Sequence, residues 1–229
     1  MPIKYAKWSH RRRRVLLRIT ARIRTQNELE HSHQRGSEIH HSSSFAVDSR
    51  MLKSRSYLEC LQSITDDSHE KREFTNEAIK ILKHRSGTDG EDISVYNRTL
   101  REWYRSWAGS LARQVTYSPG FTDCVEKHKD DYLISFHNHP NGAAPSTEDI
   151  NSALQNDYDE CYTLGHNGTI FKYCGGKYEI SQYICDQTIA KLEVIRYTEV
   201  EQSAELMRQL ASIYKFTFEE VSGPWKRKE

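Results

Sequence analysis

The sequence predicts an α/β fold with a central mixed β-sheet flanked by helices. Segments in which apolar residues recur at threes and fours alternate along the chain with short runs rich in β-branched and aromatic residues. An Asn-Gly pair, Asn167-Gly168, separates two of these runs, as in a two-residue hairpin turn. The length of 229 residues suits one ordinary domain with extensions, or at most two small domains.

Two helices are expected first. Residues 49–64 and the segment from Glu73 to Lys83 both carry apolar residues at helical spacing. Residues 84–90 then form a turn cluster with two glycines, which ends the second helix. Residues 91–97 alternate Ile93 and Val95 with polar neighbours and predict a strand.

A second strand is predicted over residues 111–118, ending at Ser118 and Pro119. The aromatic segment before it, residues 98–109, has two interpretations. It either continues a hairpin or lines a surface.

The pattern is clearer in the second half. Residues 121–130 predict a short amphipathic helix, and residues 131–136 an apolar strand that ends at His137. The loop from Pro140 to Pro145 is irregular because of its prolines and glycine, and a helix begins at Ser146. Residues 160–166 and 168–174 are the strands around the Asn-Gly turn. Residues 181–214 predict a long helix, broken once near Tyr197.

Composition divides the chain into three parts: a basic head and linker over residues 1–44, a domain over residues 45–215 and a C-terminal tail over residues 216–229. The first 27 residues contain lysines and arginines and no acid. This head either binds nucleic acid phosphates or another anionic surface, or is a solvated tail. The 5 cysteines form no CxxC pair, which favours a reducing, cytoplasmic location. No apolar run approaches the roughly 18 residues that span a membrane.

The run HNHPNGAAPSTED, from His137 to Asp149, carries the best clue to function. Two imidazoles one residue apart at a strand end project to the same side, and Asp149 lies on the first turn of the next helix. Three protein ligands with a fourth position left for water are typical of catalytic zinc. Each residue also has an ordinary interpretation. Ser146 and Asp149 form a plausible capping box, and the histidines are then hydrogen-bonded loop residues.

Hydrolysis at such a site needs a carboxylate that is not a ligand and moves protons. Glu91 is the candidate, because it follows a glycine turn and opens a strand whose end can lie near the histidines. Glu126 and Glu102 are the alternatives. The ordinary interpretation of Glu91 is an exposed acid at a strand edge.

HNHP followed by PSxxDI resembles the JAMM motif of the MPN-plus zinc metalloproteases. The matching positions are His137, His139, Ser146 and Asp149, and Glu91 falls where the family has its glutamate. The loop between His139 and Ser146 is one residue shorter than the common spacing. It resembles instead the JAMM-like domains of phage head-morphogenesis proteins and bacterial polymorphic toxins, in the RadC-related branch. The resemblance covers roughly residues 45–180.

This resemblance implies a cytidine-deaminase-like MPN fold with a helical N-terminal extension and a long C-terminal helix. It implies Zn²⁺ on His137, His139 and Asp149, a zinc-bound water activated by Glu91, and an oxyanion that accepts a hydrogen bond from Ser146. The expected reaction is hydrolysis of a peptide or isopeptide bond in a protein or peptide substrate. The alternative is a non-catalytic MPN-like module that binds an assembly partner in a phage head or toxin system. A nucleic-acid enzyme is disfavoured, because the zinc-deaminase pattern HxE with PCxxC is absent from the sequence.

Overall fold

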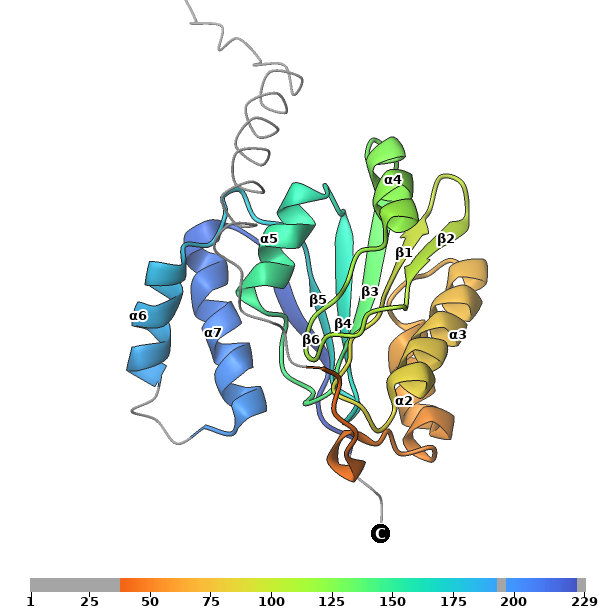
Figure 1. Cartoon of the computed structure of the whole chain (residues 1–229), viewed down its shortest axis with the longest axis horizontal. Helices are drawn as coiled ribbons and strands as arrows, with labels where there is room; N and C mark the ends of the chain where they lie inside the picture. Colours follow the sequence, from red (N-terminus) through yellow and green to blue (C-terminus); the bar gives the residue numbers. More distant parts are fainter. Residues whose placement is uncertain (1–37, 193–196, 226–229) are drawn as a thin grey trace, which may run out of the picture. The chain divides into compact units, whose positions relative to one another are not determined.

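A computed structural model describes residues 38–192 and 197–225 of the chain, and these residues form a six-stranded mixed sheet (Figure 1). The strands are β1 (Ile93–Asn97), β2 (Glu102–Ser106), β3 (Leu133–His139), β4 (Glu160–Gly165), β5 (Ile170–Tyr173) and β6 (Phe218–Ser222). Their order is β2-β1-β3-β4-β5-β6; β3 and β4 are parallel and the other neighbouring pairs antiparallel. The predicted α/β class with a helix-flanked mixed sheet is confirmed. The predictions for the basic head over residues 1–37 lie outside the described residues.

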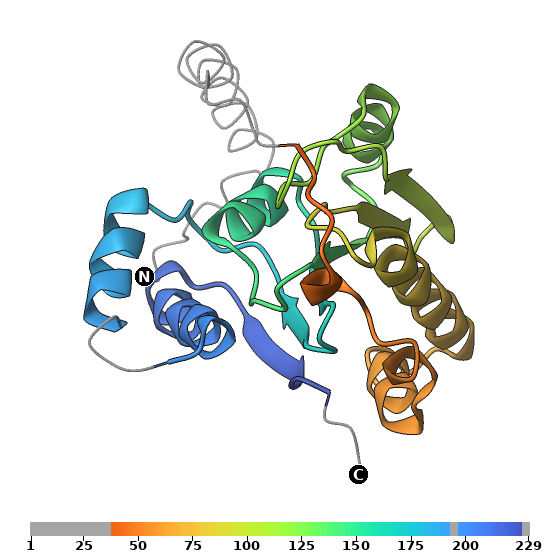
Figure 2. The same ribbon diagram turned by 60° about the horizontal axis from the view of Figure 1, so that its bottom comes forward.

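Helices cover both faces of the sheet (Figures 1 and 2). One face packs against α2 (Arg55–Gln62) and α3 (Ser68–Arg85), through a core that includes Phe74, Tyr96 and Phe136. The other face packs against α4 (Pro119–Lys127), α5 (Thr147–Gln155), α6 (Gln182–Leu192) and α7 (Glu199–Tyr214). Every residue of β1 and β3 is buried, as expected for central strands covered on both sides.

The N-terminal helical region differs from its prediction in its boundaries. A short 3₁₀ turn, Met51–Lys53, precedes α2, so the predicted helix over residues 49–64 is interrupted. The second helix begins at Ser68, before the predicted Glu73, because the Asp67 side chain accepts hydrogen bonds from the backbone N–H groups of His69 and Glu70.

The strand predicted over residues 111–118 is wrong. The strand that follows β1 in the chain and pairs with it is β2, so the hairpin interpretation of residues 98–109 is the correct one. Residues 110–118 form only isolated bridges, such as Gly90 with Ala112, and Arg113 has a left-handed backbone with φ of 51°. A left-handed residue interrupts the extended backbone that a strand needs. This segment is therefore a loop, and its residues Ala112, Arg113 and Val115 line a cavity together with Ile93 of β1.

Both predicted ends of the domain lie inside the folded unit. Residues 218–222, predicted to be tail, form the edge strand β6, which pairs with β5. Residues 38–44, predicted to be linker, contact the domain through bridges from Glu38 to Leu111 and from His41 to Thr88. The break predicted near Tyr197 separates α6 from α7, and Thr198 begins α7 with a capping box to Glu201. Within the described residues, no helix is long and apolar enough to cross a membrane.

Candidate metal centre

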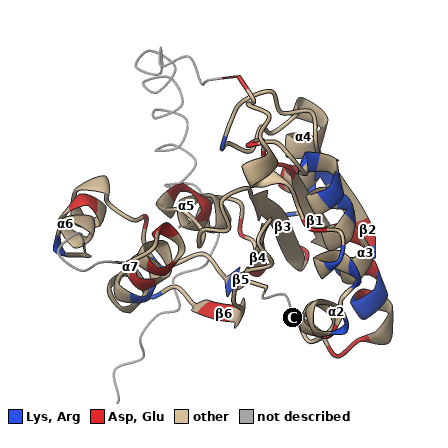
Figure 3. Ribbon diagram, turned by 90° about the horizontal axis from the view of Figure 1, so that it is seen from below, with Lys and Arg blue, Asp and Glu red and all other residues tan. Residues whose placement is uncertain are grey.

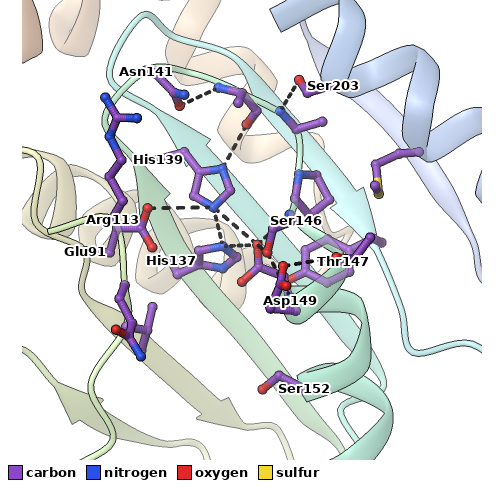
Figure 4. A pocket seen from close by; sticks show the side chains of 18 of the residues that line it. Glu91, Arg113, His137, His139, Asn141, Ser146, Thr147, Asp149, Ser152 and Ser203 are labelled. Carbon is purple, nitrogen blue, oxygen red and sulfur yellow. Dashed lines mark hydrogen bonds and ion pairs between the residues drawn. The ribbon is translucent and has the colours of Figure 1, made fainter. Parts of the chain in front are cut away.

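The end of β3 and the start of α5 bring the predicted ligands together (Figure 4). His137 and His139 are alternate residues of β3, so both side chains lie on the face that α5 covers. The prolines and Gly142 of the loop after His139 reverse the chain, and Asp149 sits in the first turn of α5. Gly142 has φ of 73°, a conformation that glycine adopts without strain.

Three ligand atoms form a nearly equilateral triangle. His137 Nε2 and His139 Nε2 are 3.1 Å apart, and Asp149 Oδ2 lies 3.5 Å from the first and 3.3 Å from the second. Two ligands of a tetrahedral zinc ion, each about 2.0–2.1 Å from the metal, are separated by about 3.3–3.4 Å. The three residues thus match one face of a tetrahedral site, and they form a group that could hold a metal ion.

A backbone carbonyl orients His139. Its Nδ1 lies 3.0 Å from the carbonyl oxygen of Ala143, so Nδ1 carries the hydrogen and Nε2 is left to face the other ligands. Burial acts to lower the pKa of His139, but the carboxylates of Glu91 and Asp149 outweigh it and raise the pKa to about 9. Without a metal, the imidazole of His139 is therefore protonated and positively charged at neutral pH.

One carboxylate oxygen of Asp149, Oδ2, both caps α5 and faces the two histidines. Its Oδ2 accepts hydrogen bonds from the Ser146 backbone N–H at 2.7 Å and from Ser146 Oγ at 2.9 Å. The capping box is therefore real, and it directs the carboxylate toward the histidines. Burial acts to raise the pKa of Asp149, but His137 and His139 hold it well below its usual range. The Ser146 hydroxyl donates its hydrogen to Asp149.

Glu91 lies beside this triangle without joining it. Its Oε1 is 4.0 Å from His139 Nε2, and only 8% of the residue is exposed. The ordinary interpretation, an exposed strand-edge acid, is therefore wrong. Burial raises the pKa of the Glu91 carboxyl, and the charge of His139 acts in the opposite direction. Of the two alternative acids, Glu126 is exposed on α4 and pairs with Lys129, which follows the helix, and Glu102 is exposed on β2.

A cavity of about 740 Å³ opens onto the triangle. The loop that contains Arg113 and Val115 forms one wall, and the opposite wall comes from α5, α6 and α7, including Ile189 and Met207. These wall residues were not predicted to belong to the site. Local patterns gave no signal for them, because they come from a segment predicted as a strand and from the apolar face of the C-terminal helices.

Asn138 and His166 were also not predicted to belong to the site. Both lie under the site, buried and hydrogen-bonded to each other. Burial lowers the pKa of His166 to about 4, so its ring is neutral at physiological pH. The one available signal was that Asn138 stands between the two histidines in the sequence.

Comparison of the chain with protein-family models, curated proteins and solved structures finds no match in any of the three.

Proposed function

We propose that the protein is a metal-dependent hydrolase of the JAMM type, with an MPN-like fold, that cleaves a peptide or isopeptide bond. The observation that carries this proposal is the buried Glu91 carboxylate 4.0 Å from His139, next to a ligand triangle that it does not complete. A site that only binds metal does not need a second, unliganded acid in this position. This acid argues against the alternative of a non-catalytic assembly module.

Zn²⁺ is the proposed metal, because two imidazoles and one carboxylate with an open position are typical of catalytic zinc. Such a metal, when bound, polarises a carbonyl group and makes water a nucleophile at neutral pH. His137, His139 and Asp149 would hold it, and the capping box keeps the Asp149 oxygen directed at the two imidazoles.

Glu91 would move the proton. Its Oε1 accepts a proton from the attacking water as the new C–O bond forms, and returns it to the leaving nitrogen as the C–N bond breaks. Its burial, which raises the pKa of the carboxyl, makes it a better base than an exposed glutamate. Ser146 would donate a hydrogen bond to the developing oxyanion after its hydroxyl turns away from Asp149.

The substrate is proposed to be a protein or peptide segment that enters between the 110–118 loop and the helices. Figure 3 shows that α5 and α7 contain acidic residues, and Glu148 of α5 lines the cavity. Arg113 lies on the opposite wall. This arrangement favours substrate residues that are neutral or basic on the helical side. We place the reaction in the cytoplasm.

The test compares wild-type protein with Glu91→Gln in the native host, by a proteomic search for new peptide termini. Glu91→Gln is expected to bind metal like the wild type and to produce no cleavage. Glu126→Gln, at an exposed acid away from the cavity, is the matched control and should retain full activity. Full activity of Glu91→Gln, or a wild-type protein that binds no metal, would overturn the proposal.

A further inference from the structure

Asn138, between the two histidines, holds the backbone on both sides of Glu91. Its Oδ1 accepts a hydrogen bond from the N–H of Asp92 at 2.9 Å, and its Nδ2 donates to the carbonyl oxygen of Gly90 at 3.0 Å. Asn138 is fully buried. Both peptide groups that flank Glu91 are thus tied to the residue between the two proposed ligands.

The side chain of Asn138 lies on the opposite face of β3 from His137 and His139. Successive residues of a strand point to opposite faces, so Asn138 points away from the cavity into which His137 and His139 project. The amide therefore reaches the Glu91 segment from beneath. It contacts the segment on both sides of Glu91 and does not line the cavity.

His166 holds the amide of Asn138 in turn. Its Nε2 is 3.1 Å from Asn138 Nδ2, and its Nδ1 is 2.7 Å from the carbonyl oxygen of Phe45. Nδ1 must carry the hydrogen, because a carbonyl can only accept, which leaves Nε2 as the acceptor for the amide. This arrangement fixes which end of the Asn138 side chain faces Gly90 and which faces Asp92.

A buried ion pair between Arg85 and Asp92 also holds the segment that contains Glu91. Arg85 Nε donates to Asp92 Oδ1 at 2.7 Å, and Asp92 is fully buried. Glu91 consequently has little backbone freedom. Its position relative to His139 depends on contacts that are made before any substrate binds.

We propose that Asn138, oriented by His166, is the positioning residue that holds Glu91 at the distance needed for proton transfer. This inference rests on the proposed function. A shift of about 1 Å in a reacting group can cost roughly 100-fold in rate. Loss of the Asn138 amide is therefore expected to lower kcat by roughly 10- to 100-fold, with KM and metal affinity retained.

The experiment uses Asn138→Leu, which keeps the volume and removes every hydrogen bond, in the full-length protein. Asn97→Leu is the matched control, because Asn97 is an equally buried, hydrogen-bonded amide of the same sheet that does not line the cavity. The measurements are hydrogen exchange of the Asp92 amide, zinc affinity, and kcat and KM on a peptide spanning a cleavage site found with the wild type. His166→Phe serves as a second variant if Asn138→Leu does not fold.

Faster exchange at Asp92 and a lower kcat in Asn138→Leu but not in Asn97→Leu, with zinc affinity unchanged in both, would support the inference. The inference would be overturned if Asn138→Leu exchanged the Asp92 amide at the wild-type rate, kept the wild-type kcat, or lost zinc affinity by as large a factor as kcat. The exchange measurement requires no substrate. A wild-type protein that cleaves nothing therefore removes the proposed function, while exchange still shows whether Asn138 holds the segment.

Discussion

Ser146 and Asp149 share one hydrogen-bonded unit in which a helix cap orients a metal-ligand candidate. The oxygen of Asp149 that lies 3.3 Å from His139 Nε2 is the same Oδ2 that accepts both hydrogen bonds from Ser146. A capping box normally satisfies only the first turn of a helix. Here it also selects the rotamer that turns the carboxylate toward the imidazoles, so the capping role of these residues is compatible with the proposed metal site.

Ser146→Ala should therefore lower stability and metal affinity together. The lost cap is expected to cost about 1 kcal/mol in the free energy of unfolding. Loss of the hydrogen bond that orients Asp149 should weaken zinc binding by roughly 10- to 100-fold. Thr198→Ala, at the matching capping box of α7, should cost similar stability and leave zinc affinity unchanged. Thermal unfolding and zinc titration measure the two effects. Equal zinc affinity in both variants would contradict the argument.

Zinc binding should release protons below about pH 9. The pKa of His139 is raised from 6.5 to about 9 in the metal-free protein, so at pH 7 the metal must displace the proton on its imidazole. Apparent affinity should rise by about tenfold per pH unit up to about pH 9 and then level off. Calorimetric titration in buffers of different ionisation enthalpy would show about one proton released per zinc at pH 7. No release at pH 7 would show that the carboxylates do not raise the pKa of His139.

The same pKa shift predicts how the metal-free protein responds to pH. Because the folded-state pKa of His139 lies above the unfolded value, its contribution to stability is complete below about pH 6.5 and is lost as pH rises through about 9. Denaturant unfolding of the chelated wild type between pH 6 and pH 10 should show this decline, and His139→Gln should lack it. An identical decline in that variant would assign the effect to another group.

The parts of the fold that the sequence predicted well are those with local signals. The apolar run of β3, the proline-bearing loop and the cap at Ser146 each determine their own conformation, so the ligand-bearing segment was placed correctly. The edge strand β6 was missed, because its residues are only partly buried and its pairing with β5 is non-local, and β2 was only one of two interpretations of its segment.

Local sequence patterns do not predict the position of Glu91 in the folded protein. Its sequence context, a glycine turn before a strand, made it the candidate acid, and the resemblance to a known family gave it the same role. The contacts that bring it near His139 come from Asn138 and His166, which lie far along the chain. No periodicity or spacing encodes such contacts, so the positioning of Glu91 emerges only from the folded chain.

Gly142→Ala should disrupt the loop that orients His139. A Cβ at Gly142 would lie 2.1 Å from Asn167 Nδ2, and its φ of 73° strains any side-chain-bearing residue. Relief of this clash and of the backbone strain should move the Ala143 carbonyl that fixes the His139 ring. The free energy of unfolding should fall by about 2–4 kcal/mol, and zinc should bind more weakly. Gly120→Ala is the control, because a Cβ there meets nothing within 4 Å, and its stability should change by less than about 1 kcal/mol. Thermal unfolding with and without zinc distinguishes the two variants.

The chain after α7 should prove essential to the domain, against its prediction as a tail. Phe216 is 5% exposed and belongs to the core beneath α7, next to the strand that pairs with β5. Phe216→Ala should lower the free energy of unfolding by about 3 kcal/mol, because it leaves a cavity in that core. Ile213→Ala is the comparison: this residue continues the apolar pattern of α7 but is 54% exposed, so its loss should change stability by less than about 0.5 kcal/mol. Denaturant unfolding of both variants measures the difference. Similar stabilities would mean that the packing of residues 216–222 contributes little to the fold.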